Sequence, residues 1–387
     1  MSKKLLSWFL VLSMCLTLCA LSIAEEDNEE VSITIFDKDG EAATDDVATT
    51  PAPVDKSAPV HQADGSILIT MSFTGDVTIG GNTQASGTSI FEKELKKQKG
   101  DINFPFRNVK AILETDDLTM VNFESTLTSS GKNRDKLEND YLFRADPSYV
   151  KMLLDNGIES VSLENNHVLD MGEEGLAETK RTLSNAGVLY SCEAEPSITT
   201  VAGVKLGCLA YQTFGGRHDE LIGKIPNDIQ ALRDQGCEIV IVSFHWGDET
   251  DYKPNDNQVR LGHATVDAGA DLVIGHHSHR INPIELYNGK YICYSLGNFS
   301  FAGNNKPKDM STFIFQIKMR VKDGVVSNDQ IKIIPCRISS RKDYNDFAPT
   351  PYDKGENIEA VIRTLRDNGK NLEYALTDYP LVWLGEE

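Results

Sequence analysis

Short apolar segments alternate with amphipathic ones along most of this chain, and this alternation restricts the possible folds more than any other feature. The apolar segments have the length and β-branched content of buried strands, at residues 67–74, 118–123, 160–163, 204–210, 238–244 and 272–274. Amphipathic helices are predicted between them, near residues 105–114, 147–156, 173–186, 226–236 and 256–268. Pro105, Pro147 and Pro226 suit first-turn positions of three of these helices. The pattern predicts an α/β fold, with ligands bound beyond the carboxyl ends of the strands.

The pattern changes after Phe301. Residues 312–321 and 330–338 predict a hairpin around Asp323-Gly324, and residues 356–368 predict a terminal helix. We therefore expect a folded domain over residues 65–347 and a helical extension over residues 348–387 packed on it.

The N-terminus has the composition of a secretory signal. Lys3 and Lys4 precede an apolar block that ends near Ser22-Ile23-Ala24, a small-x-small cleavage site, so residues 1–24 are expected to be a signal peptide. An uncleaved membrane anchor is the alternative, because the block is near the lower limit for spanning a bilayer. Residues 25–64 are acidic and rich in Thr, Ala and Pro, which predicts a disordered tether. Both readings place the rest of the chain outside the cytoplasm, secreted or anchored at the outer face of the membrane.

The net charge of -20 restricts the partners of this protein. We do not expect this protein to bind nucleic acid, because phosphate backbones bind to basic surfaces. An anionic substrate must be attracted locally, by metal ions or by well-placed arginines. Five cysteines follow the signal segment, an odd number that lies mostly in or beside apolar strands, so we expect core thiols rather than a disulfide framework.

Three histidines in four residues follow the predicted strand 272–274, in the sequence Gly275-His276-His277-Ser278-His279. Imidazole is the commonest protein ligand for transition metals, and a His-x-His pair at a strand end can direct two rings to one side. His277 and His279 fit this spacing. A polar loop with exposed histidines is the alternative.

The other strand ends also carry groups that suit a metal. Asp76 follows Phe73-Thr74-Gly75, and Asn122 and Glu124 alternate so that both face the same side of their strand. An ordinary turn aspartate and a solvent-facing edge pair are the alternatives. His245-Trp246-Gly247-Asp248-Glu249 follows the apolar strand 238–244.

The segment Asn165-Asn166-His167-Val168-Leu169-Asp170 combines three roles. The amide oxygen of Asn166 can bind a metal, and His167 beside it is placed to donate a proton to a leaving group. Asp170 is close enough in sequence to orient that imidazole by a hydrogen bond. The alternative is that the two asparagines cap the following helix.

Together these clusters supply enough ligands for two metal ions and one catalytic histidine. Two neighbouring cations would lower the pKa of a shared water and hold a phosphoryl oxygen during in-line attack. Donors of this kind suit Mn, Fe or Zn alike. We expect the substrate to be contacted by Asn122, Arg144, Trp246, Glu249, His276 and Arg280.

Several runs of residues resemble the bacterial capsule synthesis protein CapA family. They are FTGDVTIGG, VNFEST, YLFRADPSYVKMLLDNGIESVSLENNHVLDMGEEGL, SFHWGDE, GADLVIGHHSHRINPIE and YSLGNFSF, in the expected order over residues 67–303. The resemblance implies a poly-γ-glutamate-associated protein at the cell surface with a calcineurin-like metallophosphoesterase fold, a four-layer α/β/β/α sandwich. It further implies His167 as the catalytic acid and, as metal ligands, Asp76, Glu124, Asn166, His245, His277 and His279.

This sequence departs from the patterns of these families at three positions. Thr78 stands where phosphoesterases have the histidine of Asp-x-His, Glu124 stands where they have an aspartate, and Ser278 replaces a proline. Two functions therefore compete. The first is a metal-dependent hydrolase of a phosphoester or of a polymer end. The second is a non-catalytic surface component that binds an anionic polymer, poly-γ-glutamate, within a membrane synthase or export complex.

Overall fold

The structure is a computed structural model that describes residues 61–83, 88–129, 141–193 and 195–385. These residues belong to the unit Asp55–Glu387, so the expected signal peptide and nearly all of the expected tether lie outside them. Within the described residues, no helix combines the length and apolar character needed to cross a bilayer.

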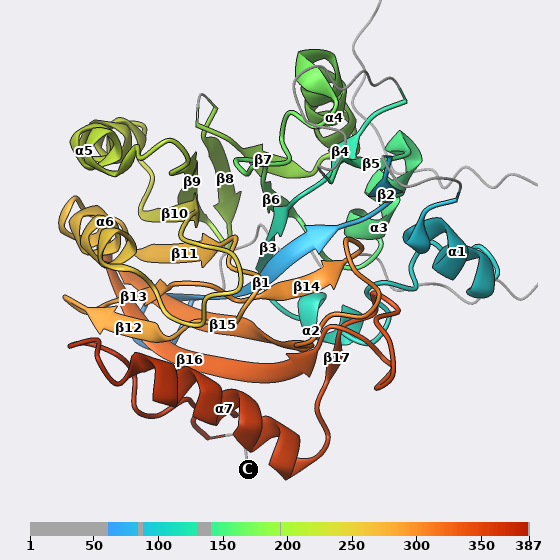
Figure 1. Cartoon of the computed structure of the whole chain (residues 1–387). Helices are drawn as coiled ribbons and strands as arrows, with labels where there is room; N and C mark the ends of the chain where they lie inside the picture. Colours follow the sequence, from blue (N-terminus) through green and yellow to red (C-terminus); the bar gives the residue numbers. More distant parts are fainter. Residues whose placement is uncertain (1–60, 84–87, 130–140, 194, 386–387) are drawn as a thin grey trace, which may run out of the picture. The chain divides into compact units, whose positions relative to one another are not determined.

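Two large sheets form the centre of the fold (Figure 1). The first has the order β17 (Thr350–Pro351), β16 (Val325–Arg337), β15 (Ser311–Lys322), β1 (Ile67–Thr78), β3 (Leu118–Phe123), β6 (Ser160–Ser162) and β7 (Leu189–Ser191), with β14 (Asn298–Phe301) also paired to β1. The second has the order β12 (Ile284–Tyr287), β13 (Lys290–Cys293), β11 (Leu272–His276), β10 (Ile239–His245), β9 (Val204–Gln212) and β8 (Ser197–Val201). A small third sheet contains β2 (Gly81–Asn82), β5 (Phe143–Ala145) and β4 (Thr126–Leu127).

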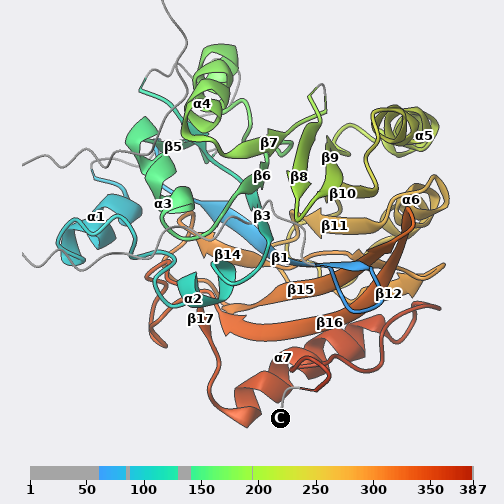
Figure 2. The same ribbon diagram turned by 180° about the vertical axis from the view of Figure 1, so that it is seen from behind.

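Helices cover the outer face of each large sheet, as Figures 1 and 2 show from opposite sides. The first sheet is covered by α1 (Ile90–Lys97), α2 (Lys110–Leu113), the 3-10 helix η1 (Pro147–Val150), α3 (Lys151–Leu154) and α4 (Gly172–Ala186). The second is covered by α5 (His218–Asp234) and α6 (Asp256–Asp267). Between the sheets lies an apolar core that includes Phe73, Met120, Ile241, Ile274 and Phe315. The layers are therefore α/β/β/α, which confirms the predicted fold class.

The C-terminal segment closes one side of this sandwich. The helix α7 (Gly355–Gly369) buries Val361, Ile362 and Leu365 in the core between the sheets, and β17 pairs with the end of β16. The predicted hairpin and terminal helix are both confirmed, with the turn at Asp323-Gly324 between β15 and β16.

Most predicted strands form within one or two residues of their expected ends, but two helices differ. The helix expected at residues 226–236 begins at His218, so Pro226 lies inside α5 rather than in its first turn. The buried face formed by Leu221, Ile225, Ile229 and Leu232 continues across the proline, and its packing outweighs the lost backbone hydrogen bond. Of the helix expected at residues 105–114, only α2 forms, after a series of turns.

A one-residue irregularity in β1 directs its last residues toward the site. Ile69, Met71 and Phe73 point into the core between the sheets, whereas Val77 points to the outer helical layer. Strict alternation would put all four on one face, but the register of β1 against β3 shifts between Phe73 and Asp76. The shift turns Asp76 toward the space between the sheets.

Candidate metal centre

Parallel strands bring the predicted clusters to one end of the sandwich. Asp76 lies opposite Asn122 across β1 and β3, and His245 lies opposite His276 across β10 and β11. The carboxyl ends of these strands meet, so residues separated by two hundred positions in sequence come into contact.

Asp76 is at the centre of the site and is fully buried. Its Oδ1 accepts a hydrogen bond of 2.9 Å from Asn122 Nδ2 and lies 3.4 Å from His276 Nδ1. Its Oδ2 lies 3.0 Å from His279 Nδ1. Burial alone would raise the pKa of this carboxyl, but the neighbouring imidazoles of His276 and His279 hold it well below the usual value. Asp76 is therefore an anion at neutral pH.

Glu124 supplies a second buried carboxylate. Its Oε1 accepts a 2.9 Å hydrogen bond from Asn122 Nδ2 and lies 3.5 Å from His245 Nδ1. Burial, together with the negative charge of Asp76, raises the pKa of Glu124 well above its usual value. The two carboxylates need a cation nearby before both can be ionised.

Among the described residues, Asp76, Glu124 and His279 form a group whose ligand atoms all lie within 4.8 Å of one another. This geometry suits one divalent ion, because carboxylate oxygen and imidazole nitrogen are ligands for such ions. The structure thus brings together three of the six predicted metal ligands in one cluster.

The other three predicted ligands lie beside it. His245 Nε2 is 2.9 Å from Asn166 Oδ1, and the ring of His277 is centred 4.6 Å from that of His245. Burial and the nearby His277 lower the pKa of His245 well below 6.5. Burial and the nearby His279 lower the pKa of His277 to about 4. Both rings are therefore neutral at pH 7, the form that binds a metal.

Two of the histidines have unusual backbone conformations. His277 has φ 91° and His279 has φ 54°, in the left-handed region that non-glycine residues seldom adopt. Strain of this kind persists only where surrounding structure enforces it, and it concentrates at functional sites. Here it turns two imidazoles of one short loop toward the same cluster.

His167 and Asp170 form the predicted pair. His167 Nδ1 lies 2.8 Å from Asp170 Oδ2, and the same oxygen accepts a 2.6 Å hydrogen bond from the backbone N–H of Phe143. Phe143 also packs its ring 4.5 Å from the imidazole. The carboxylate thus fixes the orientation of His167. The alternative of a helix cap is wrong, because α4 begins at Gly172 and Asn165 bonds to the loop and to β3 instead.

The structure places only some of the residues predicted to contact the substrate beside the cluster. The prediction for Trp246 is wrong, because this side chain is fully buried, stacks on Phe244 and donates its indole N–H to the carbonyl of Tyr294. Arg144 is exposed on the opposite face of β5 from Phe143, so the structure does not join it to the cluster. His276 is buried and faces Asp76.

Asn122, Glu249 and Arg280 lie in or near the cluster. Asn122 is buried and links the two carboxylates, which makes it part of the scaffold of the site. Glu249 is exposed, and its charge raises the pKa of Glu124 and acts on His277. Arg280 donates to the carbonyl of His279 at 2.7 Å and lies over the ring of Tyr252.

Sequence reasoning missed three residues of the site. Asn298 Oδ1 lies 2.9 Å from His279 Nδ1, Asn165 Nδ2 donates to Asn122 Oδ1 at 3.3 Å, and Phe214 packs edge-on to His277 at 4.8 Å. Asn165 and Asn298 lie within runs that also carry the family resemblance, and their place in these runs could have indicated that they belong to the site. Phe214 lies in a loop after β9 that gave no signal.

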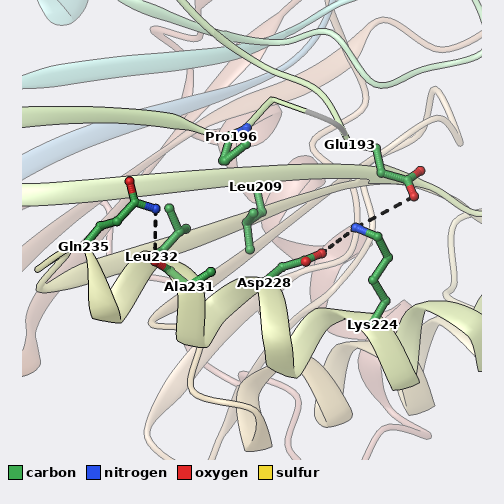
Figure 3. Close-up of a pocket in the computed structure, with 8 residues that line it drawn as sticks. All are labelled: Glu193, Pro196, Leu209, Lys224, Asp228, Ala231, Leu232 and Gln235. Carbon is green, nitrogen blue, oxygen red and sulfur yellow. Dashed lines mark hydrogen bonds and ion pairs between the residues drawn. The ribbon is translucent and has the colours of Figure 1, made fainter.

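A pocket of about 500 Å³ lies elsewhere, between β9 and α5 (Figure 3). Leu209 and Leu232 line it together with Lys224, which bridges Asp228 and Glu193. None of the predicted site residues lines this pocket. Its one lysine is already neutralised by two carboxylates, so it offers no free charge to an anionic ligand.

Comparisons with known proteins agree with the motifs. The chain matches the family described as "Bacterial capsule synthesis protein PGA_cap" over residues 70–302. It is 31% identical over 318 residues to the PGA biosynthesis protein CapA of Bacillus subtilis (strain 168), covering 77% of this chain and 78% of that protein. It is 29% identical over 345 residues to the capsule biosynthesis protein CapA of Bacillus anthracis, covering 83% and 78%.

Among solved structures, the chain resembles the calcineurin-like phosphoesterase YfkN from Bacillus subtilis. The TM-score is 0.44 at 14% sequence identity, covering 79% of this chain and 100% of that chain.

Proposed function

The chain belongs to the bacterial capsule synthesis protein family, and from this premise we propose that it is a metal-dependent hydrolase of phosphoester type. Its proposed role is in the synthesis of poly-γ-glutamate or a similar capsule polymer, outside the cytoplasm. The substrate class is a phosphoester or an anionic polymer end. Support comes from the buried Asp76, Glu124 and His279 cluster and from the orientation of His167.

The cluster passes a test of fit for metal ions. Within the described part of the chain, buried atoms without a hydrogen-bond partner include Glu124 Oε2, His276 Nδ1 and His277 Nδ1. Buried polar atoms are almost always paired, because an unpaired one costs about 1–3 kcal/mol. These unpaired atoms lie around two carboxylates, and bound cations would supply the partners that they lack.

The ligand atoms divide into two groups. Asp76, Glu124 and His279 would hold one ion. Asn166 and His245, whose ligand atoms are 2.9 Å apart, would hold a second together with His277. Two such ions would lower the pKa of a water molecule and neutralise charge on a phosphoryl oxygen.

His167 is the proposed proton donor to the leaving group. Asp170 accepts the Nδ1 proton, which leaves Nε2 as the nitrogen that exchanges a proton with substrate. Because the backbone N–H of Phe143 binds the same carboxylate oxygen, Asp170 cannot rotate freely. The chain therefore supplies a proton donor of fixed direction.

The charge of the protein limits how an anionic substrate can approach. The net charge is -20, so most of the surface repels a polyanion. Arg280 lies one residue after His279 and is half-buried, and it is the proposed contact for a substrate carboxylate or phosphate. The exposed Glu249 would repel substrates that carry excess negative charge near the leaving group.

The proposal of an extracytoplasmic location comes from the N-terminal sequence and from the capsule-related names of the relatives. The apolar block and its small-x-small site have the composition of a signal for export. Fractionation of cells that express the tagged full chain would test it, with recovery in the cytoplasm as the contrary result.

The convergence of Asp76, Glu124 and His279 in a buried cluster carries the proposal. The test is turnover of an aryl phosphodiester by protein stripped with a chelator and then supplied with Mn²⁺, Fe²⁺ or Zn²⁺. We expect activity that depends on added metal and is lost in Asp76→Ala and His245→Ala. His61→Gln, at an exposed histidine outside the site, is the matched control and should keep full activity.

A second candidate function is a non-catalytic component that binds polymer in a membrane synthase or export complex. Thr78, in place of a histidine ligand, favours it, because the phosphoesterase pattern is incomplete there. It predicts binding of poly-γ-glutamate without turnover under any metal. Metal-dependent turnover that is lost in Asp76→Ala would exclude it.

A further inference from the structure

The position of Thr78 cannot supply a metal ligand in this structure. Its hydroxyl donates a 3.0 Å hydrogen bond to the backbone carbonyl of Glu124, and the side chain is fully buried. The hydroxyl is therefore already used to hold the end of β3 against β1. If an ion binds beside Asp76, another residue must fill the place that a histidine at position 78 would take.

Asn298 lies where such a ligand is needed. It is the first residue of β14, which pairs in parallel with β1 so that Asn298 is the direct neighbour of Asp76. Its side chain is only 7% exposed, and its Oδ1 lies 2.9 Å from His279 Nδ1. It thus faces the same ring as Asp76 Oδ2.

Two glycines allow this close approach. The backbone N–H of Asp76 donates a 2.9 Å hydrogen bond to the carbonyl of Gly297, and an added Cβ at Gly75 would lie 1.8 Å from that same oxygen. Gly297 itself has φ +74°, a conformation that suits glycine. The backbone is therefore built to place residue 298 against residue 76.

The distances among these atoms match those around an ion. Asp76 Oδ2 is 3.0 Å and Asn298 Oδ1 is 2.9 Å from His279 Nδ1. An N–H at Nδ1 would have to be shared between these two oxygens. Neighbouring ligands around an octahedral ion with bonds of about 2.1 Å are about 3 Å apart. Both distances are therefore also those expected between neighbouring ligands of one ion.

We propose that Asn298 is a direct ligand of the ion held by Asp76, Glu124 and His279, in place of the histidine that Thr78 replaces. This inference rests on the proposed function, since it requires that the site binds metal. The ligand set then has three oxygen donors and one nitrogen donor. Such a set suits a harder ion such as Mn²⁺ or Mg²⁺, whereas the His245 and His277 side of the site is richer in nitrogen.

The test compares two buried neighbours of Asp76. Wild type, Asn298→Ala, Asn298→Asp and Thr78→Val are stripped with a chelator and titrated with Mn²⁺ by calorimetry, after thermal unfolding has shown each variant to be folded. We expect two ions in wild type, with one bound at least about tenfold more weakly in Asn298→Ala. Asn298→Asp keeps both ions because it keeps the oxygen donor. Thr78→Val stays within about threefold of wild type, since it removes no ligand.

A crystal structure with Mn²⁺ gives the direct readout. Anomalous data at the manganese edge locate the ion, and Asn298 Oδ1 should lie about 2.1–2.3 Å from it. An Oδ1 beyond about 3 Å, bonded only to His279, would show a positioning role and overturn the inference.

The calorimetric outcomes separate this inference from the proposed function. A wild type that binds no divalent ion overturns both. A wild type that binds two ions, with Asn298→Ala binding them equally well, overturns the ligand assignment alone. An equal loss in Thr78→Val and Asn298→Ala also overturns it, because position 78 would then contribute to the metal site.

Discussion

Gly75 lies against the backbone of Gly297, where a side chain would not fit. In Gly75→Ala, the added Cβ would lie 1.8 Å from the Gly297 carbonyl oxygen and 2.7 Å from the carbonyl carbon. Real Cβ contacts are essentially never shorter than 3.0 Å, so β1 and β14 must separate by about 1 Å or more. The atom in the way belongs to the backbone, and no side-chain rotation can relieve the clash.

The magnitude follows from two losses. Overpacking a close-packed interior costs about 1–3 kcal/mol. Breaking the buried hydrogen bond from the N–H of Asp76 to Gly297 costs about 1 kcal/mol more. The free energy of unfolding should fall by about 2–4 kcal/mol, which lowers Tm by about 3–6 °C in a folded unit of this size. The same displacement carries Asn298 away from Asp76, so Mn²⁺ affinity should fall as well.

Urea and thermal unfolding, followed by circular dichroism, measure the loss of stability, and calorimetry measures the metal affinity. Gly223→Ala is the matched control, because Gly223 is exposed within α5 and an added Cβ there meets nothing within 4 Å. Alanine at a helical position should stabilise the protein by up to about 1 kcal/mol. A Gly75→Ala protein as stable as wild type, with unchanged metal affinity, would refute the steric reasoning.

Asp170→Asn should lower the turnover number by about 10–100-fold while leaving Mn²⁺ affinity unchanged, since it acts on the orientation of His167; a parallel loss of metal would contradict this. In metal-free protein, His277 has a pKa of about 4 against 6.5 when unfolded, so the unfolded chain binds the extra proton between these values. The free energy of unfolding should therefore rise by up to about 3 kcal/mol as the pH increases from 4 to 6.5. Urea titrations at each pH should show that this rise is absent in His277→Gln. Burial raises the pKa of Cys208 to about 12, so this thiol should resist Ellman's reagent at pH 8 until urea unfolds the protein, and rapid reaction of the native thiol would contradict its burial.

The sequence predicted the architecture well because strands of a parallel sheet place their carboxyl ends together. Asp76, Glu124 and His245 each follow an apolar run, and this pattern alone indicated that they would meet. The alternation of side chains along a strand also explains why Trp246 does not contact the substrate. Side chains alternate along a strand, so Phe244 and Trp246 share the face that packs under the outer helices while His245 points between the sheets.

Other parts of the site depend on tertiary contacts that no local pattern contains. The other site residues were predicted because they follow the carboxyl ends of apolar strands. Asn298 is the first residue of its strand, so this criterion does not identify it. Its position depends on the close approach of Gly297 to Gly75, which involves residues more than two hundred positions apart. The irregularity of β1 before Asp76 likewise arises from pairing with β3, and a sequence pattern with period two cannot show it.

The site also explains how the two sheets are held together at their polar end. The apolar core between them reaches Phe73 and Ile274, and beyond it the contacts between the sheets are charged or polar, such as Asp76 with His276 and Asn122 with His245. With no cation, the raised pKa of Glu124 favours its neutral form, and the charge of Asp76 must be balanced by protons on nearby imidazoles. Burial opposes a proton on His279, but the hydrogen bond and the charge of Asp76 outweigh it and raise the pKa of His279. A divalent ion would displace that proton. It would link the two sheets through Asp76 and Glu124 on the first sheet and His279 at the end of the second. Metal binding and the stability of this end of the sandwich are therefore coupled, and each should strengthen the other.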